Sequence, residues 1–248
     1  MPADGLAVTT TGAGPRLVVV HGFTQTGRSW EAFAASLAGD HEVVSVDAPG
    51  HGGSAGVRAD LVDGAELLGD AGGRATYVGY SMGGRLCLHL AIGRPDLVER
   101  LVLVSATAGL DDAGERAARR RADEQLAATI ERDGLDAFLE RWVTQPLFAT
   151  LPDPGLEDRR RNTPAGLATS LRLAGTGTQQ PLWDRLGELT MPVLLVAGAL
   201  DAKFVAVAAR MAALLPAATL EVVADAGHTV HLEHPAAFEA LLRRWLRS

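Results

Sequence analysis

The clearest pattern along the chain is a set of short runs of β-branched and aliphatic residues that are continuously apolar rather than alternating. Strands that are buried on both faces of a parallel sheet have this pattern. We therefore predict strands at 17–20, 43–46, 76–78, 101–104, 193–196 and 220–223. Helical periodicity fills most of the gaps, at 30–38, 59–68, 82–92, 204–215 and 235–246. This alternation predicts an α/β fold, in which a mostly parallel wound sheet carries helices on both faces.

One long stretch interrupts the alternation. Residues 110–189 show helical character only, broken by prolines at Pro152, Pro154, Pro164 and Pro181. Strand character resumes at Val193. We predict that residues 1–109 and 190–248 form the core and that residues 110–189 form a helical cap, inserted after the strand that ends near Val104. Such a cap would cover the carboxyl ends of the strands, where open sheets bind ligands.

The motif Gly79-Tyr80-Ser81-Met82-Gly83 lies between a predicted strand and a predicted helix. Gly-x-Ser-x-Gly in that context is typical of a nucleophilic serine on a tight, strained turn, where larger residues beside the serine would collide with neighbouring strands. The alternative is a structural turn in which the serine only caps the helix. The context favours Ser81 as the reactive residue.

A serine hydroxyl needs a histidine to take its proton, and the histidine needs a group that fixes its tautomer. Asp201 follows the strand 193–196 and His228 follows the strand 220–223, which gives the chain order serine, acid, histidine. Asp225 is a rival acid, but it lies in the loop of the histidine itself, where a turn bond is its expected role. His231, three residues further on, fits a pocket position and a structural position equally well.

His21-Gly22-Phe23 follows the first buried strand, where this architecture supplies a donor to a developing oxyanion. The backbone N–H groups of Phe23 and Met82 are the expected pair. A second loop, Asp47-Ala48-Pro49-Gly50-His51-Gly52, follows the next strand, and we expect its role to be structural.

Composition narrows the function classes. The formal net charge of −7 disfavours nucleic acid and anionic membrane surfaces as partners. Cys87 is the only cysteine, which excludes an internal disulfide or a multi-cysteine metal site and suits a reducing compartment. Residues 1–10 lack the features of a signal peptide, and no apolar run is long enough to span a membrane. We expect a cytoplasmic protein with a core position for Cys87, no cofactor and no metal.

Although the chain as a whole is negatively charged, arginines gather near Ser81 and in the predicted cap. Arg85 lies four residues after Ser81, where a cation opposes the helix dipole, so a salt bridge or a bound anion must favour it. The predicted cap adds Arg116, Arg119, Arg120, Arg121, Arg159, Arg160 and Arg161, of which neighbouring members must point in different directions. Lys203 is the only lysine, so the chain as a whole prefers arginine. The placement of cations below the serine and in the cap nevertheless indicates a substrate with carboxylates.

Several motifs together resemble one family, the 2-succinyl-6-hydroxy-2,4-cyclohexadiene-1-carboxylate synthases of menaquinone biosynthesis, also called MenH, which have the α/β-hydrolase fold. The resemblance covers nearly the whole chain. It rests on Gly79-Tyr80-Ser81-Met82-Gly83-Gly84-Arg85, Glu115-Arg116-Ala117-Ala118-Arg119, Trp142-Val143-Thr144-Gln145-Pro146-Leu147-Phe148, Gly175-Thr176-Gly177, Gln180-Pro181-Leu182-Trp183, Asp201-Ala202-Lys203-Phe204, and Gly227-His228 with His231.

The resemblance implies a lyase in which Ser81, activated by His228, removes a proton from a small substrate with several carboxylates, after which pyruvate is eliminated. By position it implies substrate binding by Arg85, Arg119, Arg161 and Trp142, with Arg159 as the competing choice for the third arginine. Arg120 and Arg160 are expected to be solvated. Ala108 departs from the family, which often has proline before the Gly-Leu pair. The absence of proline affects the expected rigidity of the chain at the entrance to the cap.

Two other functions use the same residues. A carboxylesterase or carbon–carbon bond hydrolase would form a covalent intermediate at Ser81, but Arg85 and the cap motifs argue against it. A sensor that only binds a small molecule would not require an intact set of Ser81, Asp201 and His228.

Overall fold

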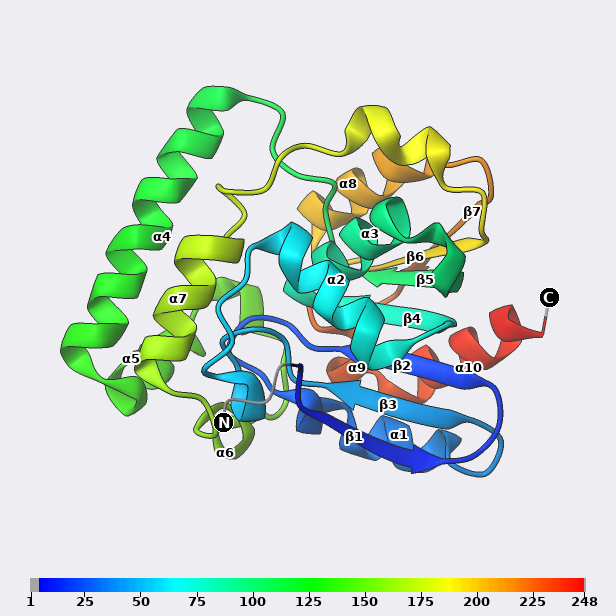
Figure 1. Ribbon diagram of the computed structural model, residues 1–248, viewed down its shortest axis with the longest axis horizontal. Coiled ribbons are helices and arrows are strands. Elements are labelled where there is room, and N and C mark those ends of the chain that lie inside the picture. Colours follow the sequence, from blue (N-terminus) through cyan, green and yellow to red (C-terminus); the bar gives the residue numbers. More distant parts are fainter. Residues whose placement is uncertain (1–4, 248) are drawn as a thin grey trace.

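A computed structural model describes residues 5–247 of the chain. The first four residues of the segment in which we expect no signal peptide lie outside this range. Strands form one sheet in the order β1-β3-β2-β4-β5-β6-β7 (Figure 1). Their bounds are β1 Val8–Gly12, β2 Arg16–Val20, β3 Glu42–Val46, β4 Ala75–Tyr80, β5 Val98–Val104, β6 Val193–Gly198 and β7 Ala218–Val223.

All neighbouring strands from β3 to β7 run parallel, as predicted, and β1 alone pairs antiparallel with β3. β1 was not predicted, because the segment Val8–Gly12 contains three threonines and no apolar run. Its side chains are mostly exposed, as an edge strand permits. The prediction that every strand is buried is wrong for β7, which forms the other edge and leaves Val222 exposed.

Helices cover both faces of the sheet, which confirms the predicted architecture. Alternate residues of β2 show why. Leu17 and Val19 pack with helices on one face and Val18 and Val20 with helices on the other, because successive strand residues point to opposite sides. The first face carries α1 Glu31–Leu37, α9 Val230–Glu233 and α10 Pro235–Leu246. The second face carries α2 Leu61–Gly72, α3 Met82–Gly93 and α8 Ala202–Ala212.

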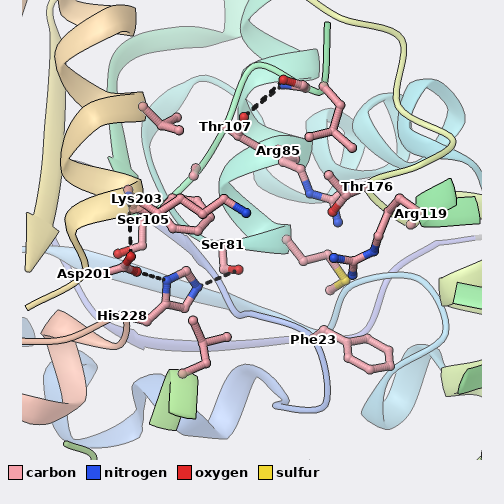
Figure 2. Close-up of a pocket in the computed structure, with 18 of the residues that line it drawn as sticks. Phe23, Ser81, Arg85, Ser105, Thr107, Arg119, Thr176, Asp201, Lys203 and His228 are labelled. Carbon is pink, nitrogen blue, oxygen red and sulfur yellow. Dashed lines mark hydrogen bonds and ion pairs between the residues drawn. The ribbon is translucent and has the colours of Figure 1, made fainter. Parts of the chain in front are cut away.

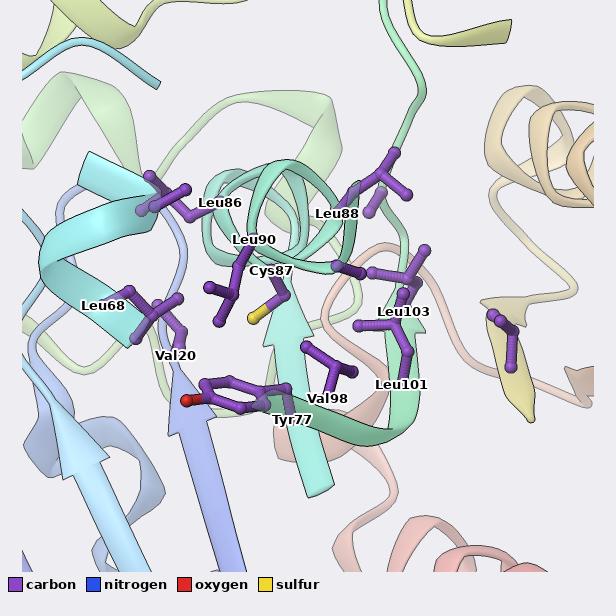
Figure 3. Packing of buried hydrophobic residues seen from close by; sticks show 14 of the residues in the cluster. Val20, Leu68, Tyr77, Leu86, Cys87, Leu88, Leu90, Val98, Leu101 and Leu103 are labelled. Atoms are coloured by element: carbon purple, nitrogen blue, oxygen red, sulfur yellow. The ribbon is translucent and has the colours of Figure 1, made fainter. Parts of the chain in front are cut away.

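Helix α3 packs at the centre of the larger core. Its side chains Leu86, Cys87 and Leu90 are buried between the sheet and α2, and Cys87 is a small core residue as predicted (Figure 3). Tyr77 of β4 lies below them and donates its hydroxyl to the carbonyl of Gly73 at 2.6 Å, which satisfies its buried polar atom. The helix that Ser81 precedes is therefore anchored along its length.

Between β5 and β6 the chain forms helices only, and we call residues 110–189 the insertion. Its helices are α4 Ala113–Asp133, α5 Leu135–Trp142, α6 Leu156–Arg159 and α7 Pro164–Ala174, and short 3-10 turns cover Pro146–Phe148 and Trp183–Glu188. Helices α4, α5 and α7 share a small core of their own, which includes Ile130, Phe138 and Leu167, whereas Trp183 and Leu186 pack into the larger core over the sheet. In Figure 1 the helices α4 to α7 lie together at one side of the sheet.

The entrance to the insertion is fixed by hydrogen bonds rather than by a proline. The carbonyl of Ala108 accepts from the N–H of Leu182 at 2.7 Å, and the carbonyl of Gly109 accepts from the indole of Trp183 at 3.0 Å. Ala108 itself is fully buried. Among residues 5–247, none of the helices has the length and apolar character that crossing a membrane requires.

Candidate active site

Ser81 lies on the turn between β4 and α3 with a left-handed backbone, at φ 51° and ψ −108°. Such a conformation is strained for a residue with a Cβ and is found at functional turns. The flanking glycines permit the turn. A Cβ on Gly79 would lie 2.5 Å from the carbonyl oxygen of Gly83, and a Cβ on Gly83 would collide with the carbonyl of Val20. Only glycine therefore fits at the positions two residues before and two residues after Ser81.

The structure brings the predicted partners of Ser81 together (Figure 2). His228 Nε2 lies 3.2 Å from Ser81 Oγ, and His228 Nδ1 lies 2.7 Å from Asp201 Oδ2. Three loops at the carboxyl ends of parallel strands supply these residues, because β4, β6 and β7 all end at the same edge of the sheet. The arrangement fits a serine whose proton passes to a histidine that the carboxylate orients.

Hydrogen bonds hold the Asp201 side chain in place and favour its charged form. It caps α8 by accepting a hydrogen bond from the N–H of Phe204 at 3.2 Å. Burial raises the pKa of Asp201, but the hydrogen bond and charge of His228, the Phe204 N–H and the nearby Lys203 outweigh it and hold that pKa below its ordinary value. The rival Asp225 has a left-handed backbone, and its carbonyl oxygen lies 3.1 Å from His234 Nε2. The acid beside His228 is therefore Asp201.

Phe23 and Met82, whose N–H groups are the predicted oxyanion donors, both line the pocket above Ser81. The Phe23 loop is held by buried contacts. Gly22 donates its N–H to the side chain of Gln25, and Arg159 donates to the hydroxyl of Thr24. The next loop supports it from below, since Thr24 N–H points to His51 Nε2 at 3.3 Å.

The pocket above Ser81 has a volume of about 790 Å³, within the usual range for small-molecule sites. It lies between the core and the insertion, because both contribute to its lining. The core contributes the triad and the predicted donors. The insertion contributes residues of α4, α5 and α7, among them Arg119, Trp142, Ser170 and Ala174.

Arg85 occupies the floor of this pocket. It is 7% exposed, and its guanidinium Nη1 donates to the carbonyl of Ala174 in α7 at 2.9 Å. No carboxylate among residues 5–247 pairs with it, so the salt bridge considered from the sequence is not what holds it. Burial lowers the pKa of Arg85 to about 10, and the charge of Arg119 acts in the same direction. A buried cation without an ion-pair partner can pair with an anion that enters the pocket.

Arg119 reaches the same pocket from α4, and its guanidinium lies near that of Arg85 in Figure 2. Asp123, one helical turn further on, accepts from Arg119 Nε at 2.8 Å and is 3% exposed. The second oxygen of Asp123 has no partner among the described residues. Two guanidiniums and one carboxylate leave a local excess of positive charge around Arg85 and Arg119, although Asp111, Asp112, Glu115 and Asp201 also line the pocket. Sequence reasoning missed Asp123, although its spacing of four residues from Arg119 on a helix was the available signal.

The third predicted arginine is not in this pocket. Arg161 is exposed and lines a separate depression of about 400 Å³, together with Arg28 and Asp47. The competing Arg159 is not among the lining residues of the main pocket either. It is buried, donates to the carbonyl of Pro154 at 2.7 Å and to Thr24, and lies 5.3 Å above the ring of Phe148.

A single turn of helix explains this placement. The side chain of Asn162 donates to the carbonyl of Thr24 at 2.6 Å and so turns Arg159 and Asn162 toward the core. Arg160 and Arg161 then face outward, and Arg160 pairs with Asp136 at 2.7 Å on the surface. Arg120 is also exposed, as expected. The sequence expectation for Arg161 is therefore not matched by the structure.

Trp142 lines the pocket as expected and packs edge to face against Phe23 at 5.4 Å. Its indole nitrogen is buried and has no acceptor within the described part of the chain. Such an N–H is available to an oxygen of a bound ligand. His231 does not face the pocket. It is buried, stacks on Trp30 at 4.1 Å, and contacts Tyr80 at 4.6 Å.

The motif Gly175-Thr176-Gly177 is explained by close packing against α4. A Cβ on Gly175 would lie 2.5 Å from Asp123 Oδ2, and one on Gly177 would lie 2.5 Å from the backbone nitrogen of Arg120. The glycines let the chain pass directly beside the helix that carries Arg119. The predicted role of the loop from Asp47 to Gly52 is structural, and Asp47 there accepts from the N–H groups of Gly27 and Gly53.

Comparison with known proteins identifies the family of the chain. The model of the alpha/beta hydrolase family matches residues 17–241. A protein of Bacillus subtilis (strain 168), which carries the provisional name of 2-succinyl-6-hydroxy-2,4-cyclohexadiene-1-carboxylate synthase, is 37% identical, and the match covers 99% of this chain and 97% of that protein. The synthase of that name from Escherichia coli O1:K1 / APEC is 33% identical, with 94% of each chain covered.

Among solved structures, that of MenH from S. aureus superimposes with a TM-score of 0.89 at 28% sequence identity, and covers 99% of this chain and 98% of its own. The similarity therefore extends through the insertion as well as the core. The chain belongs to the alpha/beta hydrolase family and, within it, to the 2-succinyl-6-hydroxy-2,4-cyclohexadiene-1-carboxylate synthases.

Proposed function

We propose that this protein is a lyase of menaquinone biosynthesis. It eliminates pyruvate from 2-succinyl-5-enolpyruvyl-6-hydroxy-3-cyclohexene-1-carboxylate and leaves 2-succinyl-6-hydroxy-2,4-cyclohexadiene-1-carboxylate. The relatives that match along nearly the whole chain bear the name of this activity. Within the molecule, the observation that carries the proposal is Arg85, a buried guanidinium without a carboxylate partner four residues after the reactive serine.

In the proposed reaction Ser81 acts as a base rather than a nucleophile. His228 takes the hydroxyl proton at Nε2, and Ser81 Oγ removes the acidic C–H proton beside the succinyl ketone. Asp201 holds the histidine ring and stabilises the positive charge that it gains. The electron pair of the C–H bond moves onto the ketone oxygen, where the N–H groups of Phe23 and Met82 would stabilise it.

The second half of the reaction breaks the carbon–oxygen bond to the enolpyruvyl group. The electron pair returns from the ketone oxygen and forms a ring double bond between C2 and C3, while the existing double bond between C3 and C4 moves to C4 and C5 and expels the enolpyruvyl oxygen from C5. The departing group takes the bonding pair as the enolate of pyruvate, and the proton held by His228 returns to it to give pyruvate. No water is consumed and no bond to Ser81 forms, so this pocket needs only to orient the substrate and move one proton.

Orientation is the proposed task of the arginines. Arg85 from below and Arg119 from α4 would hold a substrate carboxylate between them, and the buried indole N–H of Trp142 would donate to a further oxygen. An ordinary ester offers none of these anchors. The charge at the pocket wall thus supports a substrate with several carboxylates and disfavours simple esters.

The test is to supply the enolpyruvyl substrate and p-nitrophenyl acetate to the same enzyme preparation. We expect rapid pyruvate release, followed with lactate dehydrogenase and NADH, and poor ester hydrolysis. The reaction in heavy-oxygen water, stopped before carbonyl exchange, should leave both products without solvent oxygen. Efficient ester hydrolysis with a trapped acyl group on Ser81, and no pyruvate, would instead identify a hydrolase.

We further propose that the enzyme acts in the cytoplasm on this small molecule and has no nucleic-acid partner. The single cysteine and the net charge of −7 support this location and this partner class. Fractionation of cells that express the tagged chain would test it.

A further inference from the structure

The basic side chains that line the pocket differ in what they contact within residues 5–247. Arg85, Arg119, Lys203 and Arg210 are the basic side chains of the lining. Arg210 pairs with Asp111 at 2.5 Å and lies 3.7 Å above the ring of Trp183. Lys203 has neither a hydrogen-bond acceptor nor an ion-pair partner in the range 5–247, and its Nζ lies 5.8 Å from the ring of Phe204. Its charge is therefore available to a ligand.

Lys203 lies close enough to Asp201 for their charges to interact, but it forms no ion pair with that carboxylate. It lies in the first turn of α8, where the helix dipole disfavours a cation. Arg85 lies in the first turn of α3 with the same disadvantage. Lys203 is also the only lysine among the 23 lysine and arginine residues of the chain. The single lysine of the chain therefore lies in the pocket lining, close to Asp201.

Ser105 is a second unpartnered group in the same part of the pocket. It follows β5, and sheet order places β5 between the strand before Ser81 and the strand before Lys203. Its backbone has φ 48°, and its Oγ is buried without a partner among the described residues. A buried hydroxyl that lines a pocket and makes no hydrogen bond is expected to bind a ligand or a water molecule.

We propose that Lys203 and Ser105 form a second carboxylate subsite, opposite the one formed by Arg85 and Arg119. Figure 2 shows Lys203 reaching toward Ser81 from the side of Asp201, whereas Arg119 comes from the other side. The inference rests on the proposed function, whose substrate carries a ring carboxylate, a succinyl carboxylate and an enolpyruvyl carboxylate. One arginine pair cannot reach carboxylates on separate arms of a ring, so a cation across the serine completes the recognition.

Kinetics test the subsite with Lys203→Met, Lys203→Arg and the control Arg121→Met, which removes an exposed cation from α4 outside the pocket. We expect Lys203→Met to raise KM for the enolpyruvyl substrate about tenfold with a smaller change in kcat, as for a charge-assisted bond at a partly open site. Lys203→Arg should recover most of the loss and Arg121→Met should match the wild type. A KM within twofold of wild type in Lys203→Met would overturn the proposal.

Because the sequence has one lysine, its amine can be observed directly. Reductive methylation with ¹³C-formaldehyde keeps the positive charge and gives one lysine signal besides that of the chain terminus. We expect the lysine signal to shift when the cyclohexadiene product or pyruvate is added, and the shift to weaken in Ser105→Ala. A lysine signal that neither compound moves would contradict the subsite.

These outcomes separate the inference from the function on which it rests. If the wild-type enzyme releases no pyruvate from the enolpyruvyl substrate, the proposed function fails. If it releases pyruvate and Lys203→Met does so with an unchanged KM, the function stands and the subsite is wrong.

Discussion

The core and the insertion contribute to one pocket by different means. Around Ser81 the core places short polar side chains in buried, hydrogen-bonded positions, and His228 is 3% exposed. The insertion presents long arginines, many of them in exposed ion pairs such as Arg160 with Asp136 and Arg172 with Glu124. Proton transfer requires fixed distances, whereas recognition of a carboxylate tolerates some adjustment. We therefore expect the chemistry to depend on the core, and the choice of substrate to depend on the boundary between the core and the insertion.

The largest expected loss of activity comes from substitutions in the core, at Ser81, His228 and Asp201. Ser81→Ala and His228→Ala should each lower kcat by about 10³-fold or more, because no other group can take up the substrate proton. Asp201→Asn should also be severe, since the histidine could then adopt the wrong tautomer. Single-turnover pyruvate release measures the effect, and thermal unfolding checks that the variants fold. Near-normal turnover in Ser81→Ala would remove Ser81 from the reaction.

The next effect concerns the arginines at the boundary. Arg85→Met should lower kcat/KM by a factor that corresponds to a loss of about 2 to 5 kcal/mol of transition-state stabilisation, because a desolvated carboxylate would lose its partner. Arg119→Met should follow with a smaller loss, since its side chain is 46% exposed and shared with Asp123. Arg120→Met is the matched control on the same helix, and we expect less than about 1 kcal/mol. Equal losses in Arg119→Met and Arg120→Met would show that position on α4 is irrelevant to binding.

The comparison also explains what the sequence could predict. The strand-turn-helix context and the order of Ser81, Asp201 and His228 were sufficient to predict a triad whose distances the structure then supplies, because local rules of strand, turn and helix position these residues. β1 was missed because an exposed edge strand lacks an apolar run. The sequence did not distinguish Arg161 from Arg159 because neighbouring arginines have the same chemistry, and the tertiary contacts of Arg159 and Asn162 decide which of them turns inward.

Arg159 and Arg161 provide the third prediction, which tests how the insertion acts on the core. Arg159→Met should lower the free energy of unfolding by about 1 to 3 kcal/mol, because buried acceptors at Pro154 and Thr24 lose their donor. It should also lower kcat roughly tenfold with little change in KM, since the Phe23 loop would lose its support. Urea unfolding and pyruvate release measure the two effects.

Arg161→Met is the control for that variant, with an expected stability change within about 0.5 kcal/mol and unchanged kinetics. A large rise in KM in Arg161→Met would restore the role that the family resemblance implies for it. A rise in KM in Arg159→Met with unchanged stability would make Arg159 a substrate ligand.

The smallest expected effect is on the pH dependence of stability, in which the core and the insertion should differ. Burial, reinforced by the charge of His228, lowers the pKa of His231 to about 3, and burial together with the charge of His21 does the same to the pKa of His51. The folded state therefore binds fewer protons than the unfolded state between about pH 6.5 and 3, so the free energy of unfolding falls as the pH is lowered through this window. The ion pairs of the insertion are exposed, and their response is weakened by salt.

His231→Phe should isolate one proton of this dependence. Neither ring nitrogen of His231 has a partner within residues 5–247, so phenylalanine strands no hydrogen bond and keeps the stacking on Trp30. We expect stability at pH 7 to change by less than about 1.5 kcal/mol and the slope between pH 6 and pH 4.5 to decrease by up to about 1.4 kcal/mol per pH unit. Urea unfolding at several pH values, with and without 0.5 M salt (about a 4 Å screening length), measures both. An unchanged slope would mean that His231 is protonated in the folded protein, and a slope abolished by salt would assign the acid response to the surface pairs of the insertion instead.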